Sequence, residues 1–112
     1  MSERYTLKQG VDGYLARLAE MGASEATRGT YKRCLDLALA HFGEDRDLRK
    51  MIPAHVSRYF GCNATTKKPD GSERAKLSVA QIRRAFRQML AHAHEAGHID
   101  AVPLPRAEQE RG

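Results

Sequence analysis

The sequence lacks any long apolar run. A membrane span needs roughly 18 consecutive apolar residues, and no stretch of the 112 residues approaches that length. The first residues show no signal-peptide pattern. Cysteine is scarce, because Cys34 and Cys62 supply neither a disulfide framework nor a CxxC motif. These absences predict a cytoplasmic chain with reduced thiols and without a membrane partner.

The motifs of common cofactor and catalytic sites are also missing. No glycine-rich phosphate loop occurs, no internal repeat appears, and no strand-like alternation of apolar and polar residues is present. Hydrophobic residues make up 41% of the chain and charged residues 29%, which is typical of a folded globular protein. A chain of this length fits one domain that needs no disulfide or metal to fold, and we expect no cofactor.

Apolar residues recur at helical spacing in four segments. They predict helices over Leu7 to Met21, Ser24 to Gly43, Pro53 to Gly61, and Ser78 to Gly97. Ser24 and Ser78 are suitable N-cap residues, and Gln81 would complete a capping box with Ser78. The fold class is therefore all-α, a single compact bundle of four or five helices.

The remaining segments are expected to be irregular. The stretch from Asn63 to Lys76 has no large apolar residue and contains Pro69-Asp70-Gly71, so it predicts an exposed loop with a short hairpin. The chain from Val102 holds two prolines and then mostly polar residues. Residues 1–101 are thus expected to form the domain, and residues 102–112 a linker or flexible tail.

Positive charge is concentrated in one part of the sequence. The whole chain carries a formal net charge of +5. Residues 66–87 alone account for that excess, because only Asp70 and Glu73 oppose their seven basic residues, and the other charges cancel. Such a patch is typical of proteins that bind a polyanion, since neutralised phosphates release counterions. A solvated basic helix face is the alternative.

The predicted helices offer a surface for that charge. If Ile82, Phe86 and Leu90 form the buried stripe of the last helix, its three arginines point largely away from the core. Hydroxyl and basic side chains on the second helix lie off its apolar stripe. The candidate DNA-binding residues are Thr27, Arg28, Lys32, Arg33, Lys67, Lys68, Arg74, Lys76, Ser78, Gln81, Arg83, Arg84 and Arg87.

The order of these motifs resembles a known family. The run Ser24-x-x-Thr27-x-x-x-Tyr31-x-x-x-Leu35, then Phe42, Leu48 and Ile52-Pro53-x-x-Val56-x-x-Tyr59, resembles the N-terminal core-binding domain of tyrosine recombinases, or phage integrases. The run from Ser78 through Arg84, Phe86, Leu90 and Ala93 to Gly97-His98-Ile99 is similar to it too. The sequence departs from the family at residues 100–105, where an Asn-Pro is common, and in its long loop at residues 63–76.

The resemblance implies a SAM-like helical bundle that grips one face of double-stranded DNA while a separate catalytic domain closes from the other. The family's chemistry needs a tyrosine nucleophile with arginines, a lysine and histidines in that second domain. We therefore expect a chain that is not an enzyme, either an integrase fragment or a stand-alone accessory or regulatory protein of a mobile element. Its implied partners are DNA in a prokaryotic nucleoid, a recombinase catalytic domain, or other protomers on DNA.

Other constellations carry less weight. His55 and Arg58 match an HxxR spacing of the family's catalytic domain, yet they fall inside the third predicted helix, so coincidence is the better explanation. His92, His94 and His98 invite a metal site, but neither cysteine is nearby in the sequence and no metal is expected. The competing function is a helical protein-interaction module that binds an acidic protein partner through the same basic patch.

Overall fold

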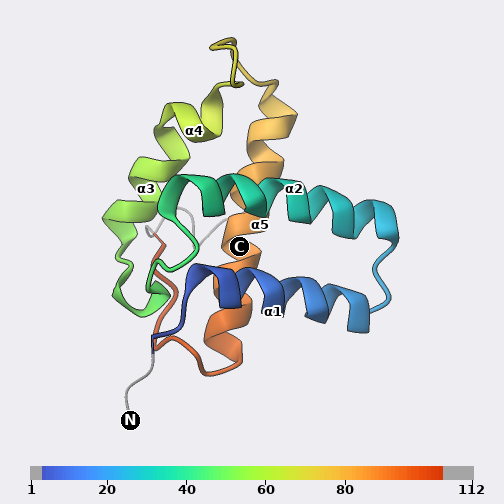
Figure 1. Cartoon of the computed structure of the whole chain (residues 1–112), viewed down its shortest axis with the longest axis vertical. Coiled ribbons are helices and arrows are strands. Elements are labelled where there is room, and N and C mark those ends of the chain that lie inside the picture. Colours follow the sequence, from blue (N-terminus) through green and yellow to red (C-terminus); the bar gives the residue numbers. More distant parts are fainter. Residues whose placement is uncertain (1–3, 105–112) are drawn as a thin grey trace.

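The computed structural model describes residues 4–104, and these residues form an all-helical domain (Figure 1). Five α-helices and one 3-10 helix follow one another along the chain. They are α1 (Leu7–Glu20), α2 (Glu25–Phe42), η1 (Leu48–Lys50), α3 (Pro53–Gly61), α4 (Asn63–Thr66) and α5 (Lys76–Glu95). The predicted all-α fold is confirmed. In the described part of the chain, β-pairing is limited to two isolated bridges, Thr6 with Asp47 and Lys67 with Glu73.

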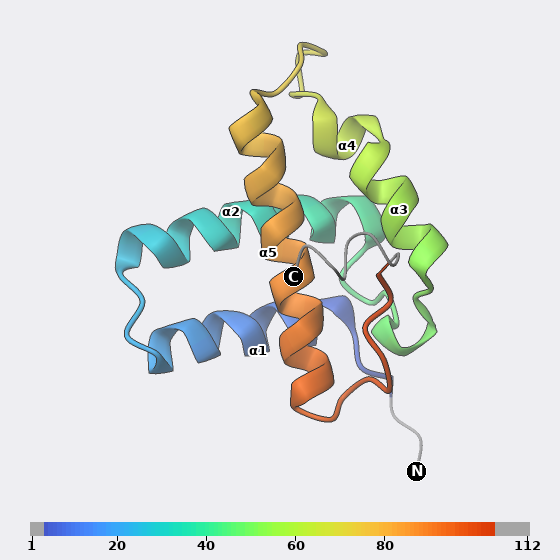
Figure 2. The ribbon, with the colours of Figure 1, turned by 180° about the vertical axis from the view of Figure 1, so that it is seen from behind.

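The long helices form a crossed arrangement. Helices α1 and α2 run side by side in opposite directions, and α5 packs across both of them (Figures 1 and 2). Helices α3 and α4 continue from one end of α2 toward the hairpin that precedes α5 (Figure 2). The hairpin, residues 67–73, projects at one end of the molecule, and the first described residues lie at the other (Figure 1).

Local sequence explains where α1 and α2 begin and end. The Oγ1 of Thr6 accepts a hydrogen bond from the Gln9 amide at 3.1 Å, and the Gln9 side chain accepts one from the Thr6 amide at 2.8 Å, which is a capping box. Ser24 caps α2 by accepting from the Thr27 amide at 3.1 Å. The helix ends at Gly43, whose φ of +95° suits glycine. The predicted limits of α2 are confirmed.

The core is built from the apolar stripes of all the long helices. Leu35 of α2, Val56 of α3 and both Phe86 and Leu90 of α5 are essentially inaccessible to solvent. The rings of Phe42, Tyr59 and Phe86 pack with centroids 5.0–5.9 Å apart, which joins α2, α3 and α5. Burial of these large side chains holds α2, α3 and α5 together.

Two expectations about element boundaries are wrong. Helix α5 begins at Lys76, so Ser78 lies inside the first turn and does not cap it. The helix begins there because the hairpin closes when the Arg74 amide donates to the Thr66 carbonyl at 2.9 Å, which leaves only Ala75 between the two elements. The expected exposed loop also contains α4, whose Thr65 is buried and donates its hydroxyl to the Tyr59 carbonyl at 2.6 Å.

The chain after α5 packs further than the sequence suggests. Gly97 follows the helix at a φ of +83°, and Ile99 then returns to the core. Leu104 is only 5% exposed, so residues 102–104 are part of the packed domain rather than a linker. The rest of the predicted tail, residues 105–112, lies outside the described residues.

None of the helices in the described part of the chain has both the length and the apolar character to cross a membrane.

Candidate nucleic-acid interface

The hairpin places several of the predicted basic residues at one end of the molecule. Its two sides meet at the isolated Lys67–Glu73 bridge, and the Lys68 amide donates to the Ser72 carbonyl at 2.8 Å. The carboxylate of Asp70 accepts from the amide and hydroxyl of Ser72 at 2.9 and 2.6 Å, and these bonds lower the pKa of Asp70. The turn is therefore held by its own side chains, as the Pro-Asp-Gly sequence predicts.

A hollow of about 550 Å³ lies between the hairpin, α4 and α2, and we call it the hairpin hollow. Lys67, Lys68 and Arg74 line it together with His41, and no carboxylate is among its lining residues. The Nε of Arg74 is buried and meets no hydrogen-bond acceptor within the described part of the chain. A hollow with basic lining residues and no carboxylate has the charge that complements an anionic group.

The lysines of the hairpin differ in how far they are engaged. Lys67 forms an ion pair with Glu73 at 3.4 Å across the hairpin. Lys68 is exposed, and no ion pair to it occurs among the described residues. Lys76, at the start of α5, is exposed as well and lines a second hollow of about 440 Å³ with Arg74 and Arg83, where the Glu73 carboxylate is also among the lining residues. Positive side chains thus flank the hairpin on both sides.

The prediction that Arg83 points away from the core is wrong. Its guanidinium donates to the Phe60 carbonyl at the end of α3, through Nη2 at 2.8 Å and Nε at 3.3 Å. It also lies 6.0 Å from the centroid of the Phe60 ring. Arg87, one turn further along the same face, is half-buried, so of the three predicted arginines only Arg84 is exposed.

The predicted residues on α2 divide between two sides of the helix. Arg28 is half-buried and donates to the Ala23 carbonyl at 3.3 Å, which ties it to the turn before the helix. Lys32 pairs with Asp36 at 2.9 Å. Because Lys32 and Cys34 are about 200° apart around the helix, Lys32 faces away from α5. Thr27 and Arg33 remain exposed.

A further hollow, of about 310 Å³, brings α2 and α5 together, and we call it the α2–α5 hollow. The predicted residues Thr27, Gln81 and Arg84 line it, so the structure unites three candidates from distant parts of the sequence. Thr30, a hydroxyl residue beside Thr27 on the same helix, lines it too, whereas sequence reasoning missed Tyr31 and Cys34 as members of the site. Ser78, although half-buried in the first turn of α5, is not among them.

Tyr31 connects Arg84 to α1. The Nε of Arg84 donates to the Tyr31 hydroxyl at 3.4 Å, and the Tyr31 ring packs edge-to-face against Tyr14 with centroids 5.7 Å apart. Burial, with a smaller contribution from the adjacent Tyr31 hydroxyl, raises the pKa of Tyr14 to about 12, so the Tyr14 phenol is neutral at physiological pH. No periodicity argument links these three positions.

The histidines have structural roles in the described residues. His55 Nδ1 accepts from the Ile52 amide at 3.1 Å and lies 3.1 Å from a guanidinium nitrogen of Arg46, which places the HxxR histidine at the start of α3. The stretch His94-Glu95-Ala96-Gly97-His98 has the HExxH spelling of a zinc-binding helix.

That spelling does not form a zinc-binding helix here, because α5 ends at Glu95. His94 Nδ1 lies 3.2 Å from the Ile99 carbonyl oxygen, while the His98 ring stacks on Tyr5 at 4.1 Å. The described residues contain no group of three side chains that could hold a metal ion.

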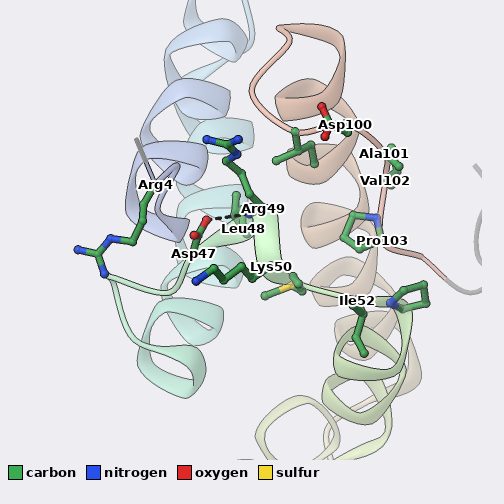
Figure 3. Close-up of a pocket in the computed structure, with 13 residues that line it drawn as sticks. Arg4, Asp47, Leu48, Arg49, Lys50, Ile52, Asp100, Ala101, Val102 and Pro103 are labelled. Carbon is green, nitrogen blue, oxygen red and sulfur yellow. Dashed lines mark hydrogen bonds between the residues drawn. The ribbon is translucent and has the colours of Figure 1, made fainter. Parts of the chain in front are cut away.

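Another hollow, of about 580 Å³, lies between η1 and the chain that follows α5 (Figure 3). Arg4, Arg49 and Lys50 surround it, but Asp47 and Asp100 lie among them. The Asp47 carboxylate accepts from the Arg49 amide at 3.0 Å at the start of η1. Because acidic and basic side chains both line it, this hollow lacks the single sign of charge found in the lining of the hairpin hollow.

A scan against protein-family models finds no match to this chain, and searches of curated proteins and of solved structures find no similar protein.

Proposed function

We propose that this domain binds double-stranded DNA through the hairpin, the start of α5 and the adjoining side of α2, mainly by contacts to the phosphate backbone. The hairpin hollow carries the proposal, because Lys67, Lys68 and Arg74 converge there without a lining carboxylate. Phosphate groups are the anions that such a set of separated cations matches over an extended surface. Arg33, Lys76 and Arg84 add exposed positive charge on the flanking helices.

The resemblance to the core-binding domain of tyrosine recombinases supports the same proposal. A SAM-like bundle of that family would present its helices and a basic loop to one face of a duplex. The chain would then act without cutting DNA, either as the gripping part of an integrase or as an accessory or regulatory factor of a mobile element. Its place would be the prokaryotic nucleoid, beside a recombinase catalytic domain or other protomers.

The second candidate is a protein-interaction module for an acidic partner. It is favoured by the ion pair between Lys67 and Glu73, which leaves one hairpin lysine engaged before any ligand arrives. Acidic protein surfaces present carboxylates at irregular spacing, whereas a duplex presents phosphates along its whole length. Salt dependence separates the two, because the release of counterions condensed on DNA has a defined slope.

The test is fluorescence anisotropy with a labelled duplex over a range of salt concentrations. We expect log K to fall linearly with log salt with a slope of roughly −4.5 to −6.3, which corresponds to about five to seven phosphate contacts at −0.9 each. A single-stranded nucleic acid of about the length of a tRNA and a polyglutamate chain serve as competitors. The competitors are compared at equal concentrations of negative charge. If polyglutamate displaces the labelled duplex as effectively as unlabelled duplex DNA does, the protein-interaction module is supported instead.

A further inference from the structure

The α2–α5 hollow differs in character from the basic surface around the hairpin. Four of its six lining residues, Thr27, Tyr31, Gln81 and Arg84, carry hydrogen-bond donors that face a ligand, and none of the six carries a carboxylate. The hydroxyl of Thr30 donates to the Ala26 carbonyl at 3.1 Å. Only one of the six is charged, and it is the exposed arginine of α5. One guanidinium surrounded by neutral donors matches one anionic group rather than a row of them.

The acidic residues of α2 do not reach this hollow. Glu25 and Asp36 each lie two positions from a lining residue, Thr27 and Cys34, and therefore about 200° away around the helix. Asp36 is in addition paired with Lys32 at 2.9 Å. A ligand in the hollow thus faces donors from two helices and no nearby carboxylate from α2.

The guanidinium of Arg84 is oriented before a ligand binds. Its Nε donates to the Tyr31 hydroxyl at 3.4 Å, while within the described part of the chain its two Nη groups meet no acceptor. Tyr31 is itself braced by the edge-to-face contact with Tyr14 on α1. Fixing one edge of a guanidinium leaves the other edge, with two parallel N–H groups, for a forked contact to phosphate oxygens.

We propose that the α2–α5 hollow binds one phosphodiester group of a nucleic acid, with Arg84 contacting the phosphate and Tyr31 positioning Arg84. The volume of about 310 Å³ accommodates the phosphate together with part of the adjoining sugar. The identity of the ligand as a nucleic acid rests on the proposed function, whereas the geometry of the site does not depend on it. Tyr31 is a positioning residue because its hydroxyl acts through the guanidinium.

The experiment uses a ligand with one phosphodiester, the dinucleotide dTpdT, and its uncharged methylphosphonate analogue. In two-dimensional 1H–15N spectra of the full chain, dTpdT should shift the Arg84 Nε–Hε signal and the amides of Thr27 and Thr30. The analogue should leave them in place. Equal shifts with both dinucleotides, or equally tight binding of inorganic phosphate, would overturn the assignment to a phosphodiester.

Three variants test the roles of the residues. Arg84→Gln should weaken dTpdT binding about tenfold or more, and Tyr31→Phe roughly three- to tenfold, as expected for charge-assisted contacts. Tyr31→Phe should also move the Arg84 Nε–Hε signal in the absence of ligand, which a purely structural role elsewhere would not do. Lys32→Gln, which removes the same charge from the opposite side of α2, should change the affinity less than twofold. An Arg84→Gln variant with parental affinity contradicts the inference.

The outcomes for the two proposals can be told apart. Retained duplex binding without any dTpdT shift at Arg84 would reject the hollow as a phosphate site and leave the proposed function intact. A dTpdT shift at Arg84 in a chain that does not bind duplex DNA would reject the proposed function and keep the site.

Discussion

The guanidinium of Arg83 on α5 bonds to the backbone carbonyl of Phe60 on α3, through Nη2 at 2.8 Å and Nε at 3.3 Å. The two residues are 23 positions apart, and the hairpin lies between them in the chain. Their contact closes the segment that carries α4 and the hairpin onto the start of α5. One arginine of the basic stretch thus holds the candidate interface in shape, while Arg84, the next residue, remains available to a ligand.

Replacing Arg83 should therefore cost stability. Arg83→Met removes two charge-assisted hydrogen bonds and leaves the Phe60 carbonyl without these donors, so we expect a loss of about 1–3 kcal/mol in the free energy of unfolding. Arg84→Met, at an exposed position, should change it by less than about 0.5 kcal/mol. Urea denaturation followed by circular dichroism measures both. Equal effects of the two substitutions would show that the contact with Phe60 does not stabilise the domain.

The close approach of α1 to η1 and α5 makes a second prediction about stability. A Cβ at Gly10 would lie 2.7 Å from the Leu48 side chain and 3.1 Å from the Met89 sulfur. Gly10→Ala should therefore destabilise the domain by about 1–3 kcal/mol through overpacking. Gly29→Ala is the matched control, because a Cβ there meets nothing within 4 Å and sits inside α2.

Gly29→Ala should stabilise the domain by roughly 0.5–1 kcal/mol, since alanine is the better residue within a helix. Thermal unfolding of the two variants at equal concentration gives the comparison. A Gly10→Ala variant as stable as the parent would mean that α1 lies further from Leu48 than described.

Part of this arrangement could be predicted from the sequence and part could not. The limits of α2 follow from Ser24 and Gly43, because caps act on neighbouring amides and carbonyls. The start of α5 was mispredicted at Ser78, since the closure of the hairpin onto Thr66 fixes it, and that pairing is not local to the helix. Helix ends that depend only on residues nearby in the sequence can be predicted from sequence patterns.

The candidate site shows the same division. The concentration of positive charge in residues 66–87 predicts a basic surface, and the structure gathers Lys67, Lys68 and Arg74 around one hollow. The contact between Arg84 and Tyr31 joins positions 53 residues apart, and no spacing rule within one helix identifies it. Helical periodicity also assigns Arg83 to the outside, because it ignores the end of α3 that packs against that face.

Two buried tyrosines predict the alkaline behaviour of the domain. Burial raises the pKa of both Tyr14 and Tyr59 to about 12, above the value of about 10 for an unfolded chain. The neutral phenols therefore favour the folded state below pH 10, and this contribution is lost as the pH rises from about 10 to about 12. In an absorbance titration at 295 nm, these two tyrosines should ionise near pH 12 together with unfolding.

The same titration in guanidinium chloride is the control, since all four tyrosines should then ionise near pH 10. Replacing Tyr14 by phenylalanine should remove one tyrosine from the late step in the native protein. A native titration complete by pH 10.5 would contradict the burial of both rings.

The most direct test of the account compares two double variants that remove the same charge from two different parts of the molecule. Lys68→Gln with Lys76→Gln neutralises the hairpin and the start of α5, whereas Lys50→Gln with Arg58→Gln neutralises exposed residues of η1 and α3. For duplex binding, the first pair should reduce the magnitude of the salt slope by about 1.8, that is 0.9 for each lost phosphate contact, and weaken affinity at least tenfold at about 0.1 M salt. The second pair should leave the slope unchanged. Equal slopes for the two double variants would contradict the claim that the hairpin end of this domain binds DNA.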